Sequence, residues 1–364
     1  MNRRAFLRNT AQVGMLLKFA PLLAFSRPTP LAQDYRKWMV IDALCGVNTD
    51  DTTVKPEVLK EAVQSGVTAI NWTISAPSFD DTVENISFVE RIVENDPEHW
   101  TMIRRHADFD NAKQDKKIGI LMGFQHPDPM GPDLKRLEIF RNLGVRVMQV
   151  TYNNRSLFGD GCLEPGNAGL SKLGHSAIAK MNELGIALDL SHSGQRTTAE
   201  GIEASKKPPL ITHAGCNAIH QHPRNKDDRE LKALADRGGV IGIYFMPYLV
   251  ASPISPAREH VIAHLDHALK VCGTEHVGIG SDGVIDTFRD TPEQRKQLAD
   301  DMANRKKLGI AAPEEDRPPY SPDLNIPDRM EIIATELQKR GYSEDVVEKV
   351  MGKNFYRAFG EIWA

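Results

Sequence analysis

Short runs of aliphatic and β-branched residues alternate along this chain with segments in which apolar residues recur at helical spacing. Runs of this length and composition are typical of strands buried on both faces of a parallel sheet. Eight of them are found, at residues 39–42, 67–72, 118–123, 145–151, 186–191, 210–213, 240–245 and 277–281. The clearest helical segments between them are residues 57–64, 171–184, 228–237 and 258–271. The alternation predicts an α/β protein built on parallel strands.

Glycines mark several of the boundaries between a helix and the next strand. Leu143-Gly144-Val145 and Leu184-Gly185-Ile186 each place a glycine where a helix ends and a strand begins. Eight strand-and-helix units predict a (β/α)8 barrel of the TIM type, whereas the alternative, a doubly wound open sheet, leaves the eightfold rhythm unexplained. The proline-rich residues 311–327 are predicted to form a surface loop, followed by a closing helix at 327–340.

The N-terminal residues have the features of an export signal rather than of a folded domain. Arg3 and Arg4 are followed by Phe6-Leu7 and by an apolar stretch at 13–25, which is too short for the roughly 20 residues that span a bilayer. The arginine pair predicts a twin-arginine signal at residues 1–32, cleaved near 26–32. The expected mature chain is a single domain at 33–364. It is expected in the periplasm, exported already folded and without stable membrane insertion.

Charge and cysteine content narrow the class of protein further. The formal net charge is −4, which gives no reason to expect nucleic acid or an anionic membrane as a partner. The four cysteines are widely spaced without a Cys-x-x-Cys pair, so neither a disulfide scaffold nor a zinc ribbon is indicated. Buried free thiols are the simpler interpretation, although one or two disulfides remain open for Cys45, Cys162, Cys216 and Cys272.

Chemically useful side chains follow the strands at the positions where a barrel carries its active site, the carboxyl ends of the strands. His192 and His213 end the fifth and sixth predicted runs, and Asp282 follows the eighth. Two imidazoles on neighbouring parallel strands can converge on one metal ion, and a nearby carboxylate can act as a general base. The pattern predicts a metal-assisted hydrolase. The competing interpretation of Asp282 is a cap on the helix that follows it.

Several short motifs in a fixed order also carry a resemblance to a known family. The chain resembles the membrane (renal) dipeptidases, zinc peptidases with amidohydrolase-like barrels, from about residue 38 to residue 359. The motifs are Leu188-Asp189-Leu190-Ser191-His192, Thr212-His213-Ala214-Gly215, His222-Pro223-Arg224-Asn225, Gly239-Val240-Ile241-Gly242, His276-Val277-Gly278-Ile279-Gly280-Ser281-Asp282 and Gly352-Lys353-Asn354-Phe355.

The resemblance implies a metal centre, but this chain departs from the family pattern. Family members hold two zinc ions bridged by a glutamate, and His192 and His213 match the histidines of the second zinc. Where the first zinc has a His-x-Asp pair, this chain has Leu44-Cys45-Gly46, and Gln125 stands at the glutamate position. Neutral glutamine lacks the negative charge that holds two dications close together. We therefore expect one zinc per chain, with the Gln125 carbonyl or Asp282 as a third ligand.

The resemblance also implies roles in substrate binding and catalysis. Asp282 matches the family's general base, and Arg224 matches an arginine that suits a substrate carboxylate. Tyr152 stands where many relatives have a histidine that steadies the scissile carbonyl oxygen, and Asn153 is expected in the same pocket. Arg224 could instead pair with Asp227 or Asp228 on the surface.

The leading functional hypothesis is a periplasmic metallo-dipeptidase that cleaves dipeptide-like amides with a metal-activated water. The expected partner is a small peptidic substrate, and the resemblance is compatible with a homodimer. One alternative is a tailoring or lyase enzyme that acts on a peptidic metabolite. The other is a binding protein derived from a dipeptidase, in which loss of the first-site ligands ended catalysis.

Overall fold

The computed structural model describes residues 35–289 and 291–364, so the predicted export signal lies outside the described residues. Within these two ranges, no helix is both long and apolar enough to cross a membrane.

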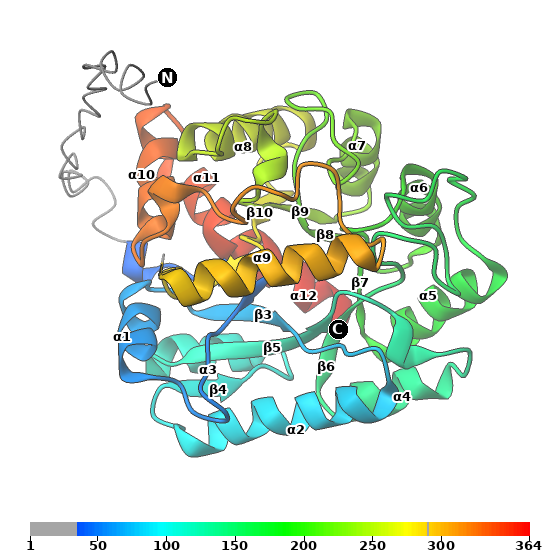
Figure 1. Cartoon of the computed structure of the whole chain (residues 1–364), viewed down its shortest axis with the longest axis horizontal. Helices are drawn as coiled ribbons and strands as arrows, with labels where there is room; N and C mark the ends of the chain where they lie inside the picture. Colours follow the sequence, from blue (N-terminus) through cyan, green and yellow to red (C-terminus); the bar gives the residue numbers. More distant parts are fainter. Residues whose placement is uncertain (1–34, 290) are drawn as a thin grey trace, which may run out of the picture.

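Eight parallel strands close into a barrel (Figure 1). Around the barrel, β1 pairs with β3 and β10, and β3 pairs with β5, which completes the ring. The remaining neighbours follow in chain order from β5 to β10. The eight strands are β1 (Ile41–Asp42), β3 (Ala69–Thr73), β5 (Ile118–Phe124), β6 (Val145–Gln149), β7 (Ala187–Asp189), β8 (Leu210–Ala214), β9 (Val240–Ile243) and β10 (Val277–Ile279). Each overlaps a predicted strand, so the predicted barrel is confirmed and the open-sheet alternative is wrong.

Three further strands were not predicted. The short β4 (Trp100–Met102) pairs with the first half of β5, while β6 pairs with its last residues. At the mouth of the barrel, β2 (Cys45–Gly46) pairs with β11 (Gly283–Val284). This small ladder holds the segment after β1 against the segment after β10, beside Asp282.

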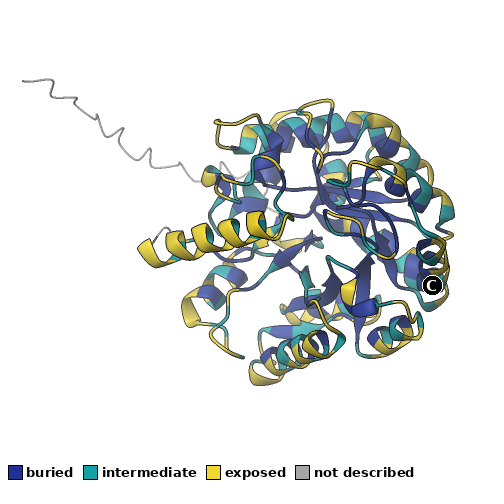
Figure 2. Ribbon diagram, turned by 45° about the vertical axis from the view of Figure 1, so that its right-hand side comes forward, coloured by how far each residue is buried: buried dark blue, intermediate teal, exposed yellow. Residues whose placement is uncertain are grey.

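Helices surround the barrel (Figures 1 and 2), and the last of them packs against the amino ends of the strands, here called the lower end of the barrel. Phe355, Phe359 and Ile362 of the last helix pack against barrel residues that include Leu121 and Val240. The lower end is therefore filled with apolar side chains, and polar chemistry is left to the opposite end. The helices are α1 (Pro56–Gln64), α2 (Phe79–Asn95), α3 (Ala107–Asp115), α4 (Lys135–Asn142), α5 (Lys172–Leu184), α6 (Gln195–Ala204), α7 (Asp228–Asp236), α8 (Arg258–Cys272), α10 (Arg329–Lys339), α11 (Glu344–Glu348) and α12 (Asn354–Trp363), with short 3-10 turns at Tyr35–Lys37, Asp128–Met130, Pro247–Leu249 and Pro322–Leu324 and a π-helical turn at Lys349–Lys353.

Helix α9 (Pro292–Lys307) differs from all of these, and the sequence pattern did not predict it. None of its residues is buried, and it appears largely exposed in Figure 2. It crosses in front of the barrel strands in Figure 1. Since four of its residues line the same cavity as His192 and Asp282, it lies over the mouth of the barrel. The proline-rich residues 311–327 form the predicted loop, interrupted only by the turn at Pro322–Leu324.

Candidate functional site

The structure brings the two predicted histidines together at the mouth of the barrel. His192 follows β7 and His213 lies within β8, and both are buried. Their Nε2 atoms are 3.0 Å apart. The expected juxtaposition of two imidazoles at neighbouring strand ends is therefore present.

The outer nitrogen of His192 is held by a side-chain amide. His192 Nδ1 lies 2.7 Å from Asn153 Oδ1, and Asn153 Nδ2 donates to the carbonyl of Ile310 at 2.8 Å. That second bond fixes the orientation of the amide, so its oxygen faces the imidazole and can only accept. His192 Nδ1 therefore carries the proton, and His192 Nε2 presents a lone pair. Asn153 lies at the predicted pocket, where it orients His192.

His213 is fixed in the same tautomer by a longer relay. The hydroxyl of Thr212 donates to Asp189 Oδ2 at 2.6 Å, so its oxygen accepts from His213 Nδ1 at 2.8 Å. Asp189 also accepts hydrogen bonds from Ser191 and Gln149, as a carboxylate does. His213 Nε2 therefore presents a lone pair as well. Sequence analysis did not single out Asp189 and Thr212 for this role, although both lie in the motifs that carry the two histidines.

Two facing lone pairs repel unless a positive charge sits close to both of them. Burial, with Arg224 nearby, lowers the pKa of both His192 and His213 well below the usual value, so a shared proton is disfavoured at neutral pH. A metal ion would accept the lone pairs of both Nε2 atoms. Histidines that bind metals usually donate their other ring N–H to an oxygen, as His192 and His213 do here. The His192–His213 pair thus fits one metal ion.

The same neighbourhood does not fit a second ion. Gln125 places its amide nitrogen 3.4 Å from His213 Nε2 and 3.5 Å from Asp282 Oδ1, and it contributes no charge. Cys45 is buried, Arg329 Nη2 lies 3.9 Å from its sulfur, and burial raises the pKa of the thiol well above its usual value. Across residues 35–289 and 291–364, no three His, Cys, Asp or Glu side chains are grouped to hold a metal. This applies to the first ion as well as to a second, so within these ranges the two imidazoles lie together without a third ligand of these types in place.

Asp282 follows β10 and lines the same cavity as His192. Its side chain is partly buried, and desolvation raises the pKa of its carboxyl to about 7 against the opposing effects of Arg224 and Arg305. Its backbone has a positive φ of 59°, and its N–H donates to the carbonyl of Leu44 at 2.9 Å. Asp282 is followed by β11, and the next helix, α9, is capped by Thr291. The helix-cap interpretation of Asp282 is therefore wrong.

Arg224 is buried and lines the site, so it is not a surface residue. Its Nη1 donates to the carbonyl of Ser191, and its Nη2 donates to the carbonyl of His213 at 3.4 Å. In the part of the chain that the structure describes, no carboxylate forms an ion pair with it. The alternative of a surface pair with Asp227 or Asp228 is wrong.

Tyr152 covers His192 and is oriented by a residue from α9. The two rings stack with centroids 4.2 Å apart. The Tyr152 hydroxyl accepts from Arg305 Nη1 at 3.0 Å, and Arg305 forms an ion pair with Glu315. Burial raises the pKa of Tyr152, so the phenol is protonated at neutral pH. Sequence analysis missed Arg305 and Glu315, because neither follows a strand or belongs to a motif.

These groups line a cavity of about 220 Å³. The barrel supplies Gln125, Tyr152, Asn153, His192, Arg224 and Asp282, and α9 supplies Leu298, Asp301, Met302 and Arg305. All seven predicted site residues are thus brought to one place, since His213 contacts His192 directly.

Two open questions about other residues are answered by the structure. All four cysteines are free thiols, three of them buried. The second question is whether another imidazole joins the His192–His213 pair, and His126, next to Gln125, is the candidate. Its Nδ1 lies 3.1 Å from Asp128 Oδ2, and its ring centroid is 6.4 Å from that of Tyr152, so it does not join the histidine pair.

Comparison with known proteins places this geometry in a family context. The family model "Membrane dipeptidase (Peptidase family M19)" matches residues 30–310. The dipeptidase tcpJ of Claviceps purpurea is 27% identical over 322 residues, which is 84% of this chain and 68% of that protein. The dipeptidase verJ of Clonostachys rogersoniana is 27% identical over 287 residues, which is 77% of this chain and 65% of that protein.

Solved structures extend the likeness over the whole barrel. A Pseudomonas aeruginosa amidohydrolase has 30% identity and a TM-score of 0.81, with coverage of 90% of this chain and 98% of that one. A Rhodobacter sphaeroides metallo peptidase, liganded with a phosphinate mimic of the dipeptide L-Ala-D-Ala, has 20% identity and a TM-score of 0.70, with coverage of 84% and 90%. The second likeness supports the fold.

Proposed function

The chain belongs to the membrane dipeptidase family, and on that premise we propose that it cleaves the amide bond of dipeptides or dipeptide-like substrates with one zinc ion. The observation that carries the proposal is the convergence of the Nε2 atoms of His192 and His213, 3.0 Å apart, beside a cavity that the carboxylate of Asp282 also lines. The family supports a peptidase in general terms. The single metal and the roles of individual residues are our proposal.

His192 and His213 would hold the zinc ion, with the Gln125 carbonyl or Asp282 as a further ligand. When bound there, zinc would supply Lewis acidity and make water a stronger nucleophile at neutral pH. Asn153 and Thr212 would keep both imidazoles in the tautomer that binds a metal.

Asp282 is the proposed general base and acid. A carboxyl group with a pKa near 7 can accept a proton from the attacking water and return it to the leaving amine nitrogen. A carboxyl group at its usual pKa near 4 would be a much weaker base and would rarely hold the proton for the second step.

Tyr152 is the proposed donor to the scissile carbonyl oxygen. Because its own oxygen accepts from Arg305, its hydroxyl proton is free to point into the cavity. There it can stabilise the negative charge that develops on the substrate oxygen. Arg224 uses one proton of each terminal nitrogen for a backbone carbonyl, and its remaining protons can bind a substrate carboxylate.

The proposal includes export to the periplasm by the twin-arginine route, supported by the Arg3-Arg4 pair and the apolar stretch at 13–25. A homodimer is the oligomeric state that the family resemblance suggests, and size-exclusion chromatography with light scattering would test it.

Substitution of one imidazole tests the proposal. Purified mature protein should hydrolyse alanyl dipeptides, and His192→Ala should abolish both zinc binding and turnover. His126→Ala is the matched control, because it removes an imidazole from the same side of the barrel without touching the pair. Full activity of His192→Ala, or dipeptide binding without any turnover by the unaltered protein, would overturn the proposal.

A further inference from the structure

A second cavity adjoins the candidate active site. It has a volume of about 270 Å³ and shares Asp282, Leu298, Asp301 and Pro319 with the central cavity. Its remaining walls include aromatic and aliphatic side chains, namely Phe245, Val284, Phe288, Tyr320 and Leu324. We call it the apolar cavity. Asp282 therefore lies at the boundary of the two cavities, within reach of a group in either of them.

Helix α9 presents one face to both cavities. Gln294, Leu298, Asp301, Met302 and Arg305 recur at helical spacing, and each lines a cavity. Although Leu298 and Met302 lie on this inner face, neither is fully buried. The helices around the barrel bury their apolar faces against strands, whereas α9 faces open space. A substrate group bound in the cavity would shield the apolar side chains of this face from water.

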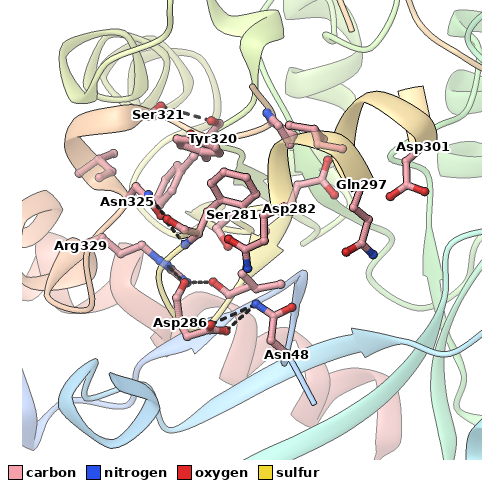
Figure 3. A pocket seen from close by; sticks show the side chains of 18 residues that line it. Asn48, Ser281, Asp282, Asp286, Gln297, Asp301, Tyr320, Ser321, Asn325 and Arg329 are labelled. Carbon is pink, nitrogen blue, oxygen red and sulfur yellow. Dashed lines mark hydrogen bonds between the residues drawn. The ribbon is translucent and has the colours of Figure 1, made fainter. Parts of the chain in front are cut away.

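Figure 3 shows how the apolar cavity is framed. Gln297 and Asp301 project from α9 on one side, Asn325 and Arg329 lie on the other, and Asp282 lies between them. Arg329 already donates to the carbonyls of Asp286 and Val284. Its guanidinium is therefore engaged by the protein itself.

The distribution of charge sets the direction in which a dipeptide lies. The cations Arg224 and Arg305 line the central cavity but not the apolar cavity. Asp282 and Asp301 line both cavities, and Asp286 lines only the apolar cavity. The one cation among the described residues of the apolar cavity, Arg329, is already engaged by backbone carbonyls. A dipeptide with its carboxylate at the arginines directs its amino-terminal residue past Asp282 and under α9.

We propose that the preferred substrates are dipeptides whose amino-terminal residue carries a bulky apolar side chain, seated in the apolar cavity. This inference rests on the proposed dipeptidase function and adds the substrate class. Burial of a large apolar side chain, compared with a methyl group, should raise kcat/KM about 10- to 100-fold. An apolar residue at the carboxyl-terminal position should give no comparable gain, because that end faces the arginines.

Three substrates test the direction of binding. We expect the kcat/KM of Phe-Ala to exceed that of Ala-Ala by about 10-fold or more, and Ala-Phe to remain close to Ala-Ala. Each peptide should be assayed with L- and D-residues at the carboxyl terminus. Equal values for Phe-Ala and Ala-Ala, or a preference for Ala-Phe, would overturn the inference while leaving the proposed function intact.

Two variants on α9 test whether the preference for Phe-Ala arises at the wall of the apolar cavity. Leu298→Asp places a charge at the wall of the apolar cavity, and Ala299→Asp places the same charge on the exposed neighbouring position. Both should fold, because α9 has no buried residue. The ratio of kcat/KM for Phe-Ala over Ala-Ala should fall about 10-fold in Leu298→Asp and stay unchanged in Ala299→Asp. An unchanged ratio in both variants would contradict the assignment.

A binding measurement distinguishes failure of this inference from failure of the proposed function. Calorimetry with Asp282→Asn, which should not turn over peptides, is expected to show tighter binding of Phe-Ala than of Ala-Ala. If no dipeptide is hydrolysed by the unaltered chain but this difference remains and Leu298→Asp removes it, the function fails and the inference stands. Equal binding of the two peptides would overturn the inference.

Discussion

The Nε2 atoms of His192 and His213 lie 3.0 Å apart, and the Nδ1 proton of each ring is already donated to a neighbouring oxygen. A structural pair of core histidines would share a hydrogen bond from one ring to the other. Here neither inner nitrogen has a proton to give, so no such hydrogen bond holds the pair, and the proposed metal ion would satisfy both lone pairs.

The first prediction concerns the amide that holds His192. Asn153→Ala should weaken zinc binding about 10- to 100-fold, because His192 loses the acceptor that fixes its tautomer and ring orientation. Competition with a metal chelator measures the affinity. Asn154→Ala is the matched control, since its amide contacts only the exposed loop at Gly309. Equal zinc affinity in both variants would show that Asn153 does not support the ligand.

The second prediction is the pH dependence of catalysis. The general base must be ionised, so kcat/KM should rise with pH as one proton leaves Asp282, with a midpoint no higher than the metal-free value of about 7, because a bound cation stabilises the carboxylate. Below that midpoint the carboxyl is protonated and activity should fall about tenfold per unit. Asp282→Asn should lose both the activity and the inflection. A profile without this inflection would be incompatible with this role.

The third prediction links the same group to stability. The folded protein holds the Asp282 proton up to about pH 7, whereas the unfolded chain releases it near its ordinary pKa of 3.8. Stability is therefore lost as the pH rises from about 4 to 7. In metal-free protein, Asp282→Asn should be more stable than the unaltered chain by up to about 4 kcal/mol at pH 8, with little difference near pH 4. Urea unfolding at both pH values measures this.

If the stability advantage of Asp282→Asn did not increase with pH, ionisation of the Asp282 carboxyl would not destabilise the folded protein, and this prediction would be wrong. The comparison must be made after removal of zinc, because a bound cation would stabilise the charged carboxylate and hide the effect.

The fourth prediction concerns the phenol above His192. Tyr152→Phe should lower kcat about 10²- to 10³-fold with little change in KM, because a donor to the developing oxyanion is lost while the ring and its stacking remain. Tyr356→Phe removes a hydroxyl that contacts only Asp110 on the surface and serves as the control. If both variants retained full kcat, the assignment of Tyr152 would be wrong.

Much of the fold could be predicted because the barrel strands are buried on both faces. Continuous aliphatic runs such as residues 118–123 and 240–245 can be recognised in a single sequence, and their alternation with helices predicted the barrel. The position of His192 and His213 at strand ends then followed from the geometry of parallel sheets. Strand β4 was missed because three residues form too short a run to stand out.

Helix α9 escaped prediction for a different physical reason. Its surroundings are solvent and cavity, so its sequence lacks the apolar periodicity by which helices are recognised. Its ends carry the remaining signal, since Thr291 caps it, Pro292 is its first residue and Arg305 to Lys307 occupy its last turn. The contact of Arg305 with Tyr152 joins positions far apart in the chain, and no local pattern records it.

The central claim is that this chain holds one catalytic zinc through His192 and His213. Elemental analysis of protein exported with its native signal, assayed in parallel for dipeptide hydrolysis, tests it most directly. The account predicts one zinc per chain, with turnover lost when chelation removes the zinc and regained when it is restored. Two zinc ions per chain, or full turnover by metal-free protein, would contradict it.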